Sequence, residues 1–253
     1  MRSGASLVRM QTERTDKESS PRAEQDREPD PVSHPELVAL AELMRDFRGE
    51  HGCAWHEQQT HESLVPYLTE ESAEVIDAIE TGTPADLREE LGDLLFQVLF
   101  HSDIAEAAGE FTLEDVAREQ AAKLRHRNPH VFGDTPTRDV DEIIRLWHER
   151  KAEQKRHRTS VLDGISHAMP ALALAAKVLG RAEELGMDVS PEQLAALAVG
   201  EEEQEDKFGG SLLATVSAAR AAAFDSERAL RGAVRRLEYR IREHEAGTSR
   251  EQS

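Results

Sequence analysis

The chain has 253 residues, of which 50 are Asp or Glu and 31 are Lys or Arg, so its net charge is −19. A surface this acidic repels the nucleic acid backbone, and we expect no nucleic-acid partner. The chain shows neither an apolar run of membrane-spanning length nor the pattern of a signal peptide, so we expect no membrane anchor. The single cysteine, Cys53, excludes an internal disulfide and suits the cytoplasm. Abundant Ala, Leu and Glu with only 4% aromatic residues favour an all-α fold.

In chain order, residues 1–33 come first and are polar, charged and proline-containing, which predicts a disordered tail. Apolar residues at helical spacing then predict helices over about 35–48, 61–80, 84–108, 112–127, 139–156 and 169–185. The break between the second and third of these carries a strong restart signal. Thr83 can cap the new helix, Pro84 suits its first position, and Asp86 lies in its first turn.

The helix predicted over 61–80 has an acid inside its apolar stripe. The stripe consists of Leu64, Leu68, Val75 and Ile79. The repeat expects one more apolar residue between Leu68 and Val75, and Glu71 occupies that place. A carboxylate set among apolar side chains is costly unless something stabilises its charge.

Four acids are placed symmetrically about the turn at Gly82. Glu71 and Asp93 lie equally far from Gly82 on either side, and so do Glu74 and Glu90. In an antiparallel helix pair, equal offsets give roughly equal heights, and residues at i and i+3 share a face. The pattern therefore predicts two facing pairs of carboxylates, with Glu70 alongside.

Carboxylates held this close repel one another, and a hard divalent cation removes the conflict. Mg²⁺ prefers oxygen ligands and keeps several waters, and such a site usually serves a phosphate-bearing substrate. The sequence therefore predicts a metal site formed by Glu71, Glu74, Glu90 and Asp93. The alternative is an ordinary solvated acidic hairpin. It fits any one of these acids, but it explains less well an acid in the stripe together with the matched offsets.

The same segment resembles the MazG family of nucleoside triphosphate pyrophosphohydrolases. "EESAEVIDAI" followed by "LREELGDLLFQV" is similar to the family's Glu-x-x-Glu, spacer, Glu-x-x-Asp signature. "CAWHEQQTHESLVPYL", "KLRHRNPHVFG" and "SVLDGISHAMPALALAAKVLGRAEELGMD" also resemble family segments, although Ala54 and His56 stand where the family usually has Pro and Asp. The likeness is dense from about residue 35 to about 188 and weaker to about 245.

The resemblance implies an all-α MazG-like helical bundle that works as a homodimer. It implies hydrolysis of an NTP or dNTP between the α- and β-phosphates with Mg²⁺, for which Mn²⁺ is a possible substitute. Glu71, Glu74, Glu90 and Asp93 would hold the metal, and Glu70 or one of these acids would orient the attacking water. The implied domains are a catalytic helical domain over 34–160, a linker helix and a degenerate second unit over 161–245, and a disordered tail over 246–253.

Four further residues are predicted to bind substrate. Lys123 and Arg127, at i and i+4, match basic positions that contact the phosphates, although spacing alone fits a surface pair equally well. Trp147 matches a position associated with the base, where an indole could stack, and Lys151 lies one turn further on. Without the resemblance, Trp147 reads as a core or interface tryptophan.

The last third of the chain echoes the acidic region without its acids. Residues 210–240 parallel residues 92–127 in a Gly-x-Leu-Leu start, an apolar helix, a capped restart and a basic end. Ser211 stands where Asp93 stood, and Phe208 stands where Glu90 stood. We interpret this segment as the second, degenerate MazG-like unit. The acidic run from Glu201 to Asp206 is predicted to be a solvated loop.

Two rival functions remain open at this stage. One is a related all-α hydrolase with a narrower substrate, such as dUTP, dCTP or a phosphoribosyl compound. The other is a catalytically inactive scaffold or regulatory partner, in which the degenerate unit dimerises. Several histidines, among them His51, His56 and His61, lack a matching acid or cysteine at ligand spacing, and we expect them at the surface.

Overall fold

The structure is a computed structural model that describes residues 34–156, 158–197 and 204–251. The tail predicted over 1–33 lies outside the described residues. The described residues contain helices and no strands, which confirms the all-α fold class. They belong to two compact units that divide between Lys155 and Arg156, a few residues before the boundary predicted at 160.

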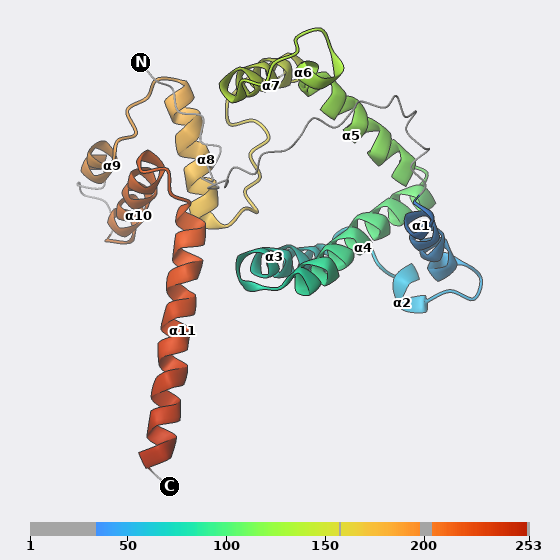
Figure 1. The fold of residues 1–253 in the computed structure, drawn as a ribbon, viewed down its shortest axis with the longest axis horizontal. Coiled ribbons are helices and arrows are strands. Elements are labelled where there is room, and N and C mark those ends of the chain that lie inside the picture. The colour runs from blue at the N-terminus through green and yellow to red at the C-terminus, as the bar shows by residue number, and fades with distance from the viewer. Residues whose placement is uncertain (1–33, 157, 198–203, 252–253) are drawn as a thin grey trace, which may run out of the picture. The chain divides into compact units, whose positions relative to one another are not determined.

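Seven helices form the first unit, in the blue to green part of the ribbon (Figure 1). They are α1 (Pro35–Arg48), α2 (Ala54–Glu57), α3 (Val65–Thr81), α4 (Pro84–Ala108), α5 (Leu113–Arg127), α6 (Pro129–Phe132) and α7 (Val140–Gln154). The long helix α4 organises the unit: α3 lies antiparallel beside it, α1 packs across it, and α5 leaves its end (Figure 1). Helix α7 packs on α5.

The boundaries of α4 follow from its local sequence. The hydroxyl of Thr83 accepts a hydrogen bond from the backbone of Asp86, and the Asp86 carboxylate accepts one from the backbone of Thr83. This reciprocal capping box confirms the predicted restart. The helix ends at Gly109, which adopts the left-handed conformation (φ 72°) that glycine reaches without strain. An equivalent capping box between Thr112 and Asp115 then starts α5.

The core of the first unit lies under the second half of α4. Met44 of α1, Leu64, and Leu99 and Phe100 of α4 are almost completely buried there. The acids Glu90 and Asp93 lie in the first half of the same helix. Helix α4 therefore carries the site at one end and anchors the fold at the other.

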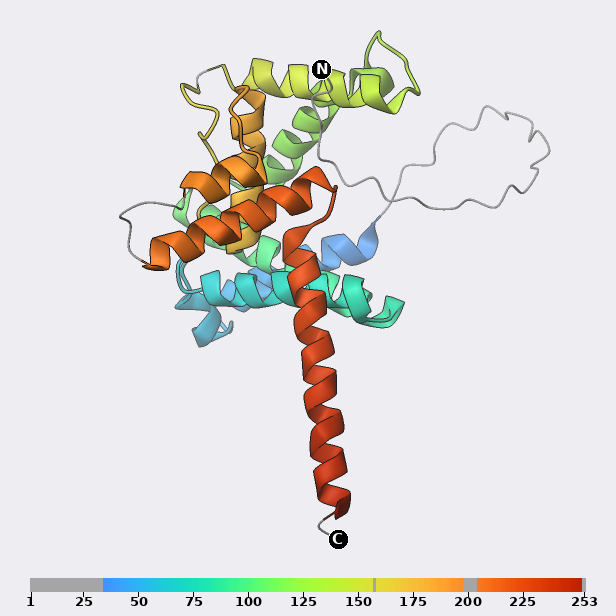
Figure 2. The same ribbon diagram turned by 90° about the vertical axis from the view of Figure 1, so that its left-hand side faces the viewer.

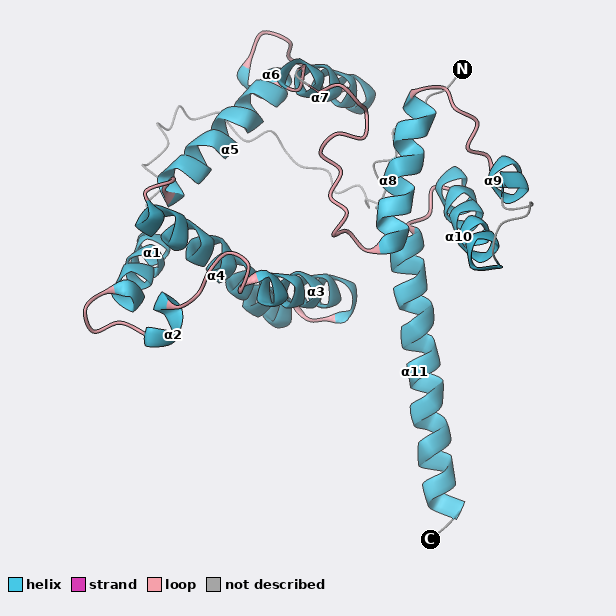
Figure 3. Cartoon of the chain, turned by 180° about the vertical axis from the view of Figure 1, so that it is seen from behind, coloured by secondary structure: helices cyan, strands magenta, loops and turns pink. Residues whose placement is uncertain are grey.

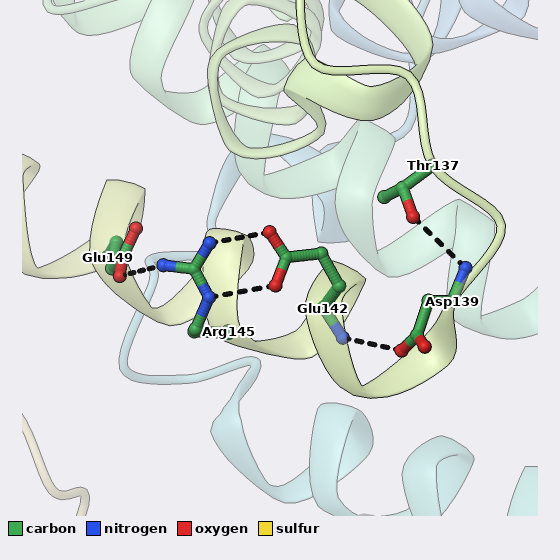
Figure 4. Close-up of polar contacts among 5 residues, drawn as sticks. All are labelled: Thr137, Asp139, Glu142, Arg145 and Glu149. Carbon is green, nitrogen blue, oxygen red and sulfur yellow. Dashed lines mark hydrogen bonds and ion pairs between the residues drawn. The ribbon is translucent and has the colours of Figure 1, made fainter.

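Outside this core, α7 has several local polar contacts at its start and along its exposed side. The Asp139 carboxylate caps the helix by accepting from the backbone of Glu142 at 3.0 Å, and Thr137 accepts from the backbone of Asp139 (Figure 4). Arg145 bridges Glu142 and Glu149, one turn to either side (Figure 4). These contacts lie on the exposed side of α7, the helix to which Trp147 also belongs.

The second unit contains α8 (Ala171–Glu184), α9 (Pro191–Leu197), α10 (Gln204–Ala221) and α11 (Ser226–Glu251), drawn in orange to red (Figure 2). Its core joins α8, α9 and α10 through Leu179, Val189, Leu194, Ala214 and Val216. The Glu227 carboxylate accepts a hydrogen bond from the backbone of Ala173 at the start of α8, which fixes the beginning of α11. Beyond that point α11 runs on as a long single helix (Figure 3).

Two expectations for this unit differ from the structure. Helix α11 continues to Glu251, past residue 245, where a disordered tail was expected to begin. Glu205 and Asp206 were assigned to a solvated loop, but they form the first turn of α10, where their charges suit the helix dipole. Residues 201–203 of that acidic run lie outside the described residues.

Candidate active site

The candidate site is carried by the helical hairpin of α3 and α4. Glu70, Glu71 and Glu74 come from α3, and Glu90 and Asp93 come from α4. Gly82 caps the end of α3 and lies against the last turn of that helix, where an added Cβ would lie 2.8 Å from the Cα of Ala78. The turn therefore has no room for a larger residue.

Three of the predicted ligands come together. One carboxylate oxygen each from Glu71, Glu90 and Asp93 lie within 4.8 Å of one another. Glu71 and Glu90 are half-buried and Asp93 is exposed, so the cluster opens to solvent on one side. Glu74 and Glu70 are exposed and lie outside this group of three.

The electrostatics of Glu71 reflect its place in the apolar stripe. Burial raises the pKa of the Glu71 carboxyl above its usual value, and the charge of Asp93 is the next largest cause. Glu74, Glu70 and Glu90 add smaller repulsions that raise this pKa further. Both effects disfavour the charged form of an acid.

Glu90 behaves in the same way on the facing helix. Burial raises the pKa of Glu90, and Glu74 is the next largest cause, ahead of Glu89, Asp93 and Asp86. The strongest repulsions therefore run between Glu71 and Asp93 and between Glu74 and Glu90, which are the two pairs expected at matching heights across the turn.

The donor set fits a hard divalent cation. Among the described residues, no lysine or arginine forms an ion pair with Glu71, Glu90 or Asp93, so their mutual repulsion has no compensating charge from the protein. Carboxylate oxygens are the ligands that Mg²⁺ and Mn²⁺ prefer. Such a cation would relieve the repulsion that raises both pKa values.

The predicted substrate-binding residues gather elsewhere in the unit. The indole of Trp147 on α7 has the Arg127 guanidinium 5.4 Å and the Lys151 ammonium 4.6 Å from its ring centroid. These distances are typical of cation–π contacts. The Arg127 Nε also donates to Gln154 at 2.8 Å, which joins α5 to α7. Lys123 is exposed, and its ammonium donates to Gln120 on its own helix.

The carboxylates and the cations therefore lie on different helix pairs. The acids belong to α3 and α4, whereas Arg127, Trp147 and Lys151 join α5 to α7. Within the described part of this unit, α7 packs extensively on α5 alone.

A buried polar network that joins α1, α2 and α4 was missed by sequence reasoning. His56 was expected at the surface, and that expectation is wrong, because it is only 2% exposed. Its ring stacks on Phe100 with centroids 3.8 Å apart, and its Nε2 lies 3.1 Å from Asp103. The Arg48 guanidinium also donates to Asp103, at 2.7 Å. Both contacts to Asp103 join residues more than forty positions apart along the chain, so local spacing gives no sign of them.

Two further histidines form a contact between α4 and the segment before α3. The Nδ1 atoms of His61 and His101 lie 2.8 Å apart, and their rings are nearly parallel. Burial lowers the pKa of the His101 imidazole, and the neighbouring His61 lowers it further. His61 is half-buried rather than fully at the surface. His61 precedes the first residue of α3, so the helical register about Gly82 gave no sign of the contact.

Comparison with known proteins supplies the family. The family model described as the MazG nucleotide pyrophosphohydrolase domain matches residues 59–132, which include all five acids. The nucleoside triphosphate pyrophosphohydrolase/pyrophosphatase MazG of Thermotoga maritima is 38% identical over 218 residues, which are 81% of this chain and 84% of that protein. The nucleoside triphosphate pyrophosphohydrolase of Escherichia coli K12 is 35% identical over 228 residues, 83% of this chain and 86% of that protein.

A solved structure, of a MazG-related protein from Thermotoga maritima, aligns with 45% of this chain and 97% of its own at 30% identity, with a TM-score of 0.40. The class that the fold and the relatives define is that of the all-α nucleotide pyrophosphohydrolases. Within it, this chain belongs to the MazG family. No described helix is both long enough and apolar enough to cross a membrane.

Proposed function

We propose that this protein is a Mg²⁺-dependent nucleoside triphosphate pyrophosphohydrolase. It cuts NTPs or dNTPs between the α- and β-phosphates, releases the monophosphate and pyrophosphate, and so clears the nucleotide pool of the cytoplasm. The observation that supports this most strongly is the cluster of Glu71, Glu90 and Asp93, within 4.8 Å of one another in the segment that matches the family model. Mn²⁺ is expected to replace Mg²⁺, because both take carboxylate oxygens.

The acidic side chains of the hairpin have two proposed roles, metal binding and orientation of the attacking water. Glu71, Glu74, Glu90 and Asp93 would hold the cation, which neutralises the triphosphate and polarises the phosphoryl group when it is bound. Glu70 is exposed beside Glu71 and accepts a hydrogen bond from the attacking water. Without a cation, five carboxylates would repel a triphosphate, so the acids alone cannot bind this substrate.

The cationic group supplies the remaining contacts. Lys123, Arg127 and Lys151 provide positive charge for the phosphates, and Trp147 offers a flat surface on which a base stacks. The Nε of Arg127 donates to the neutral amide oxygen of Gln154. A phosphate could therefore displace an amide rather than break an ion pair there.

The decisive experiment measures pyrophosphate release from a panel of NTPs and dNTPs with and without Mg²⁺. We expect metal-dependent release in the wild type and none in Glu74→Ala. Glu106→Ala is the matched control, because it removes an exposed acid from α4 outside the hairpin site. Release of orthophosphate would show that the scissile bond is wrongly assigned, and no release from any nucleotide would favour one of the rival functions.

The rivals separate on one further variant. A scaffold keeps Glu71 at a cost, since burial and repulsion raise the pKa of this residue, so Glu71→Leu should stabilise a scaffold. In the enzyme, the same change removes metal binding and activity. A narrow-substrate hydrolase would retain metal binding in the wild type but act on few members of the panel.

We also propose that the protein is a homodimer, and the surface of α11 supports this. Leu230, Val234, Leu237 and Ile241 follow the three-and-four spacing of a coiled-coil seam. Each is about half exposed within its own unit, from 46% to 56%. If two copies pair antiparallel with Val234 opposite Leu237, all four layers are apolar, and Arg231 of one helix falls near Glu238 of the other.

The mass of the full chain in solution tests this seam. Leu237→Glu places a charge in it, whereas Tyr239→Glu places the same charge on the opposite, exposed face of the same helix. We expect Leu237→Glu to weaken the dimer and Tyr239→Glu to leave it intact, as measured by sedimentation. A monomeric wild type, or equal effects of the two changes, would contradict pairing through this seam.

A further inference from the structure

One buried polar group on α4 lacks a partner. Gln97 is only 4% exposed, and its amide oxygen is fully buried with no hydrogen-bond partner among the described residues. Burying an amide oxygen without a hydrogen bond costs free energy, and most such groups in proteins are satisfied by the protein or by bound water. The orphaned oxygen of Gln97 therefore indicates a missing hydrogen-bond donor.

The helical repeat places this residue beside the acids. Gln97 follows Asp93 by four positions and Glu90 by seven, so all three lie on one face of α4. Side chains on a helix lean toward its N-terminus, which brings the Gln97 amide back toward the level of Asp93. On the antiparallel helix α3, Glu71 leans the other way, away from Gly82 and toward the level of Gln97.

The second unit provides an internal comparison. At the places of Glu90, Asp93 and Gln97, α10 carries Phe208, Ser211 and Thr215. Thr215 is exposed, and its hydroxyl donates to the backbone oxygen of Ser211 at 2.8 Å. Where the acids are missing, the orphaned amide is also missing, so the two features occur together.

We propose that Gln97 is a positioning residue of the carboxylate site: its amide oxygen accepts a hydrogen bond from a water molecule of the cation held by Glu71, Glu90 and Asp93. This inference rests on the proposed metal-dependent function. Mg²⁺ keeps several of its waters in protein sites, and those waters are strong donors that need acceptors. An amide oxygen supplies one without adding another negative charge to a cluster that already repels itself.

The test measures Mn²⁺ affinity by paramagnetic resonance, with no nucleotide present, together with the stability of the metal-free protein. Gln97→Leu removes the acceptor while nearly keeping the volume. We expect it to weaken Mn²⁺ binding about tenfold, in line with the loss of other outer-shell partners. The metal-free variant should be as stable as the wild type or more so, because an apolar side chain replaces an unsatisfied polar one.

Two further variants separate this role from packing. Gln97→Glu keeps both the shape and the acceptor, and should bind Mn²⁺ at least as tightly as the wild type. Ser102→Ala changes another buried polar residue of α4, whose hydroxyl donates to the backbone of Val98, and should leave the affinity unchanged. An unchanged affinity in Gln97→Leu, or a lowered one in Gln97→Glu, would overturn the proposal.

Failure of the inference can be told from failure of the proposed function. If the wild type binds no Mn²⁺ at all, both are wrong. If the wild type binds Mn²⁺ and Gln97→Leu binds it equally well, only the role of Gln97 is wrong. If Gln97→Leu kept the Mn²⁺ affinity of the wild type but lost much stability without metal, the amide would serve the packing of the hairpin. That result would also overturn the proposal.

Discussion

Helices α4 and α10 share a sequence pattern but differ in the residues that could bind a metal. Both carry Gly-x-Leu-Leu, followed by an apolar stretch and a capped restart. In α4 the residues around the glycine include Glu90 and Asp93, which the hairpin holds close to Glu71. In α10 the corresponding Phe208 is 65% exposed, and Ser211 donates to its own helix backbone. Helix α10 therefore forms and packs in its own unit without acids at the corresponding positions.

The comparison also shows what the acids cost. In the first unit, burial and repulsion raise the pKa values of Glu71 and Glu90, which is a strain on the metal-free fold. The described part of the second unit has no such cluster, and its core of Leu179, Leu194 and Val216 forms without it. A charge cluster kept against its own repulsion is better explained by function than by folding.

The largest expected effect comes from giving α4 the chemistry of α10. Asp93→Ser removes one carboxylate of the cluster and should lower the rate of pyrophosphate release on the order of 10²–10³-fold, as the loss of one electrostatic stabiliser does in other enzymes. Ser211→Ala is the matched change in the second unit and should leave the rate unchanged. Steady-state assays with Mg²⁺ measure both, and equal losses would show that the second unit takes part in the reaction.

The same pair of units shows how far sequence reasoning reaches. The start of α4 was predictable, because Thr83, Pro84 and Asp86 are local signals that need no tertiary contact. The facing of the acids was predictable too, because the short connection between Thr81 and Pro84 fixes the register of the two helices. Whether those acids hold a metal is a chemical role, and it stays a prediction.

What could not be predicted depends on distant contacts. His56 is buried because Asp103 and Phe100 come to it from another helix, and no local pattern marks that meeting. Spacing on α5 and α7 showed which cations share a face, but their meeting over Trp147 required the packing of the two helices. The continuation of α11 to Glu251 was missed because residues 246–251 are mostly polar and include Gly247, a composition typical of a tail.

The two cores can be separated by matched truncations. Phe100 is fully buried under α4, so Phe100→Ala should destabilise the first unit by about 3–5 kcal/mol. Val216 is 1% exposed in the second unit, and Val216→Ala should cost about 2 kcal/mol there. Hydrogen exchange with mass spectrometry reports each unit separately. Loss of protection in both units from either change would mean that the two units fold as one.

Removing a helix cap in either unit should have a smaller effect. Thr112 belongs to a reciprocal capping box with Asp115, whose pKa is lowered to about 2 by hydrogen bonds from the Thr112 side chain and backbone. At the start of α11, Asp225 accepts a single backbone hydrogen bond, from Arg228. Thr112→Ala and Asp225→Ala should each cost about 1 kcal/mol. Urea midpoints would measure both, and an effect near zero for Asp225→Ala would show that α11 starts without its cap.

The smallest expected effect is a pH response from a histidine pair of the first unit. His101 pairs with His61, and burial followed by the charge of His61 lowers the pKa of His101 below its usual 6.5, whereas α10 has Ala219 at this place. As the pH falls below that usual value, the unfolded chain binds the proton more readily than the folded one, so the free energy of unfolding falls.

This contribution is present above pH 6.5 and is lost as the pH drops through the lowered pKa of the folded state. Urea unfolding of the first unit, compared between about pH 8 and about pH 5, should therefore show a loss of stability. The loss should be smaller in the His101→Gln variant. The His101→Gln variant keeps a polar side chain that can still bond to His61 but cannot take up the proton. If the free energy of unfolding fell equally between the two pH values in the wild type and the variant, other histidines of the unit would set its response to acid.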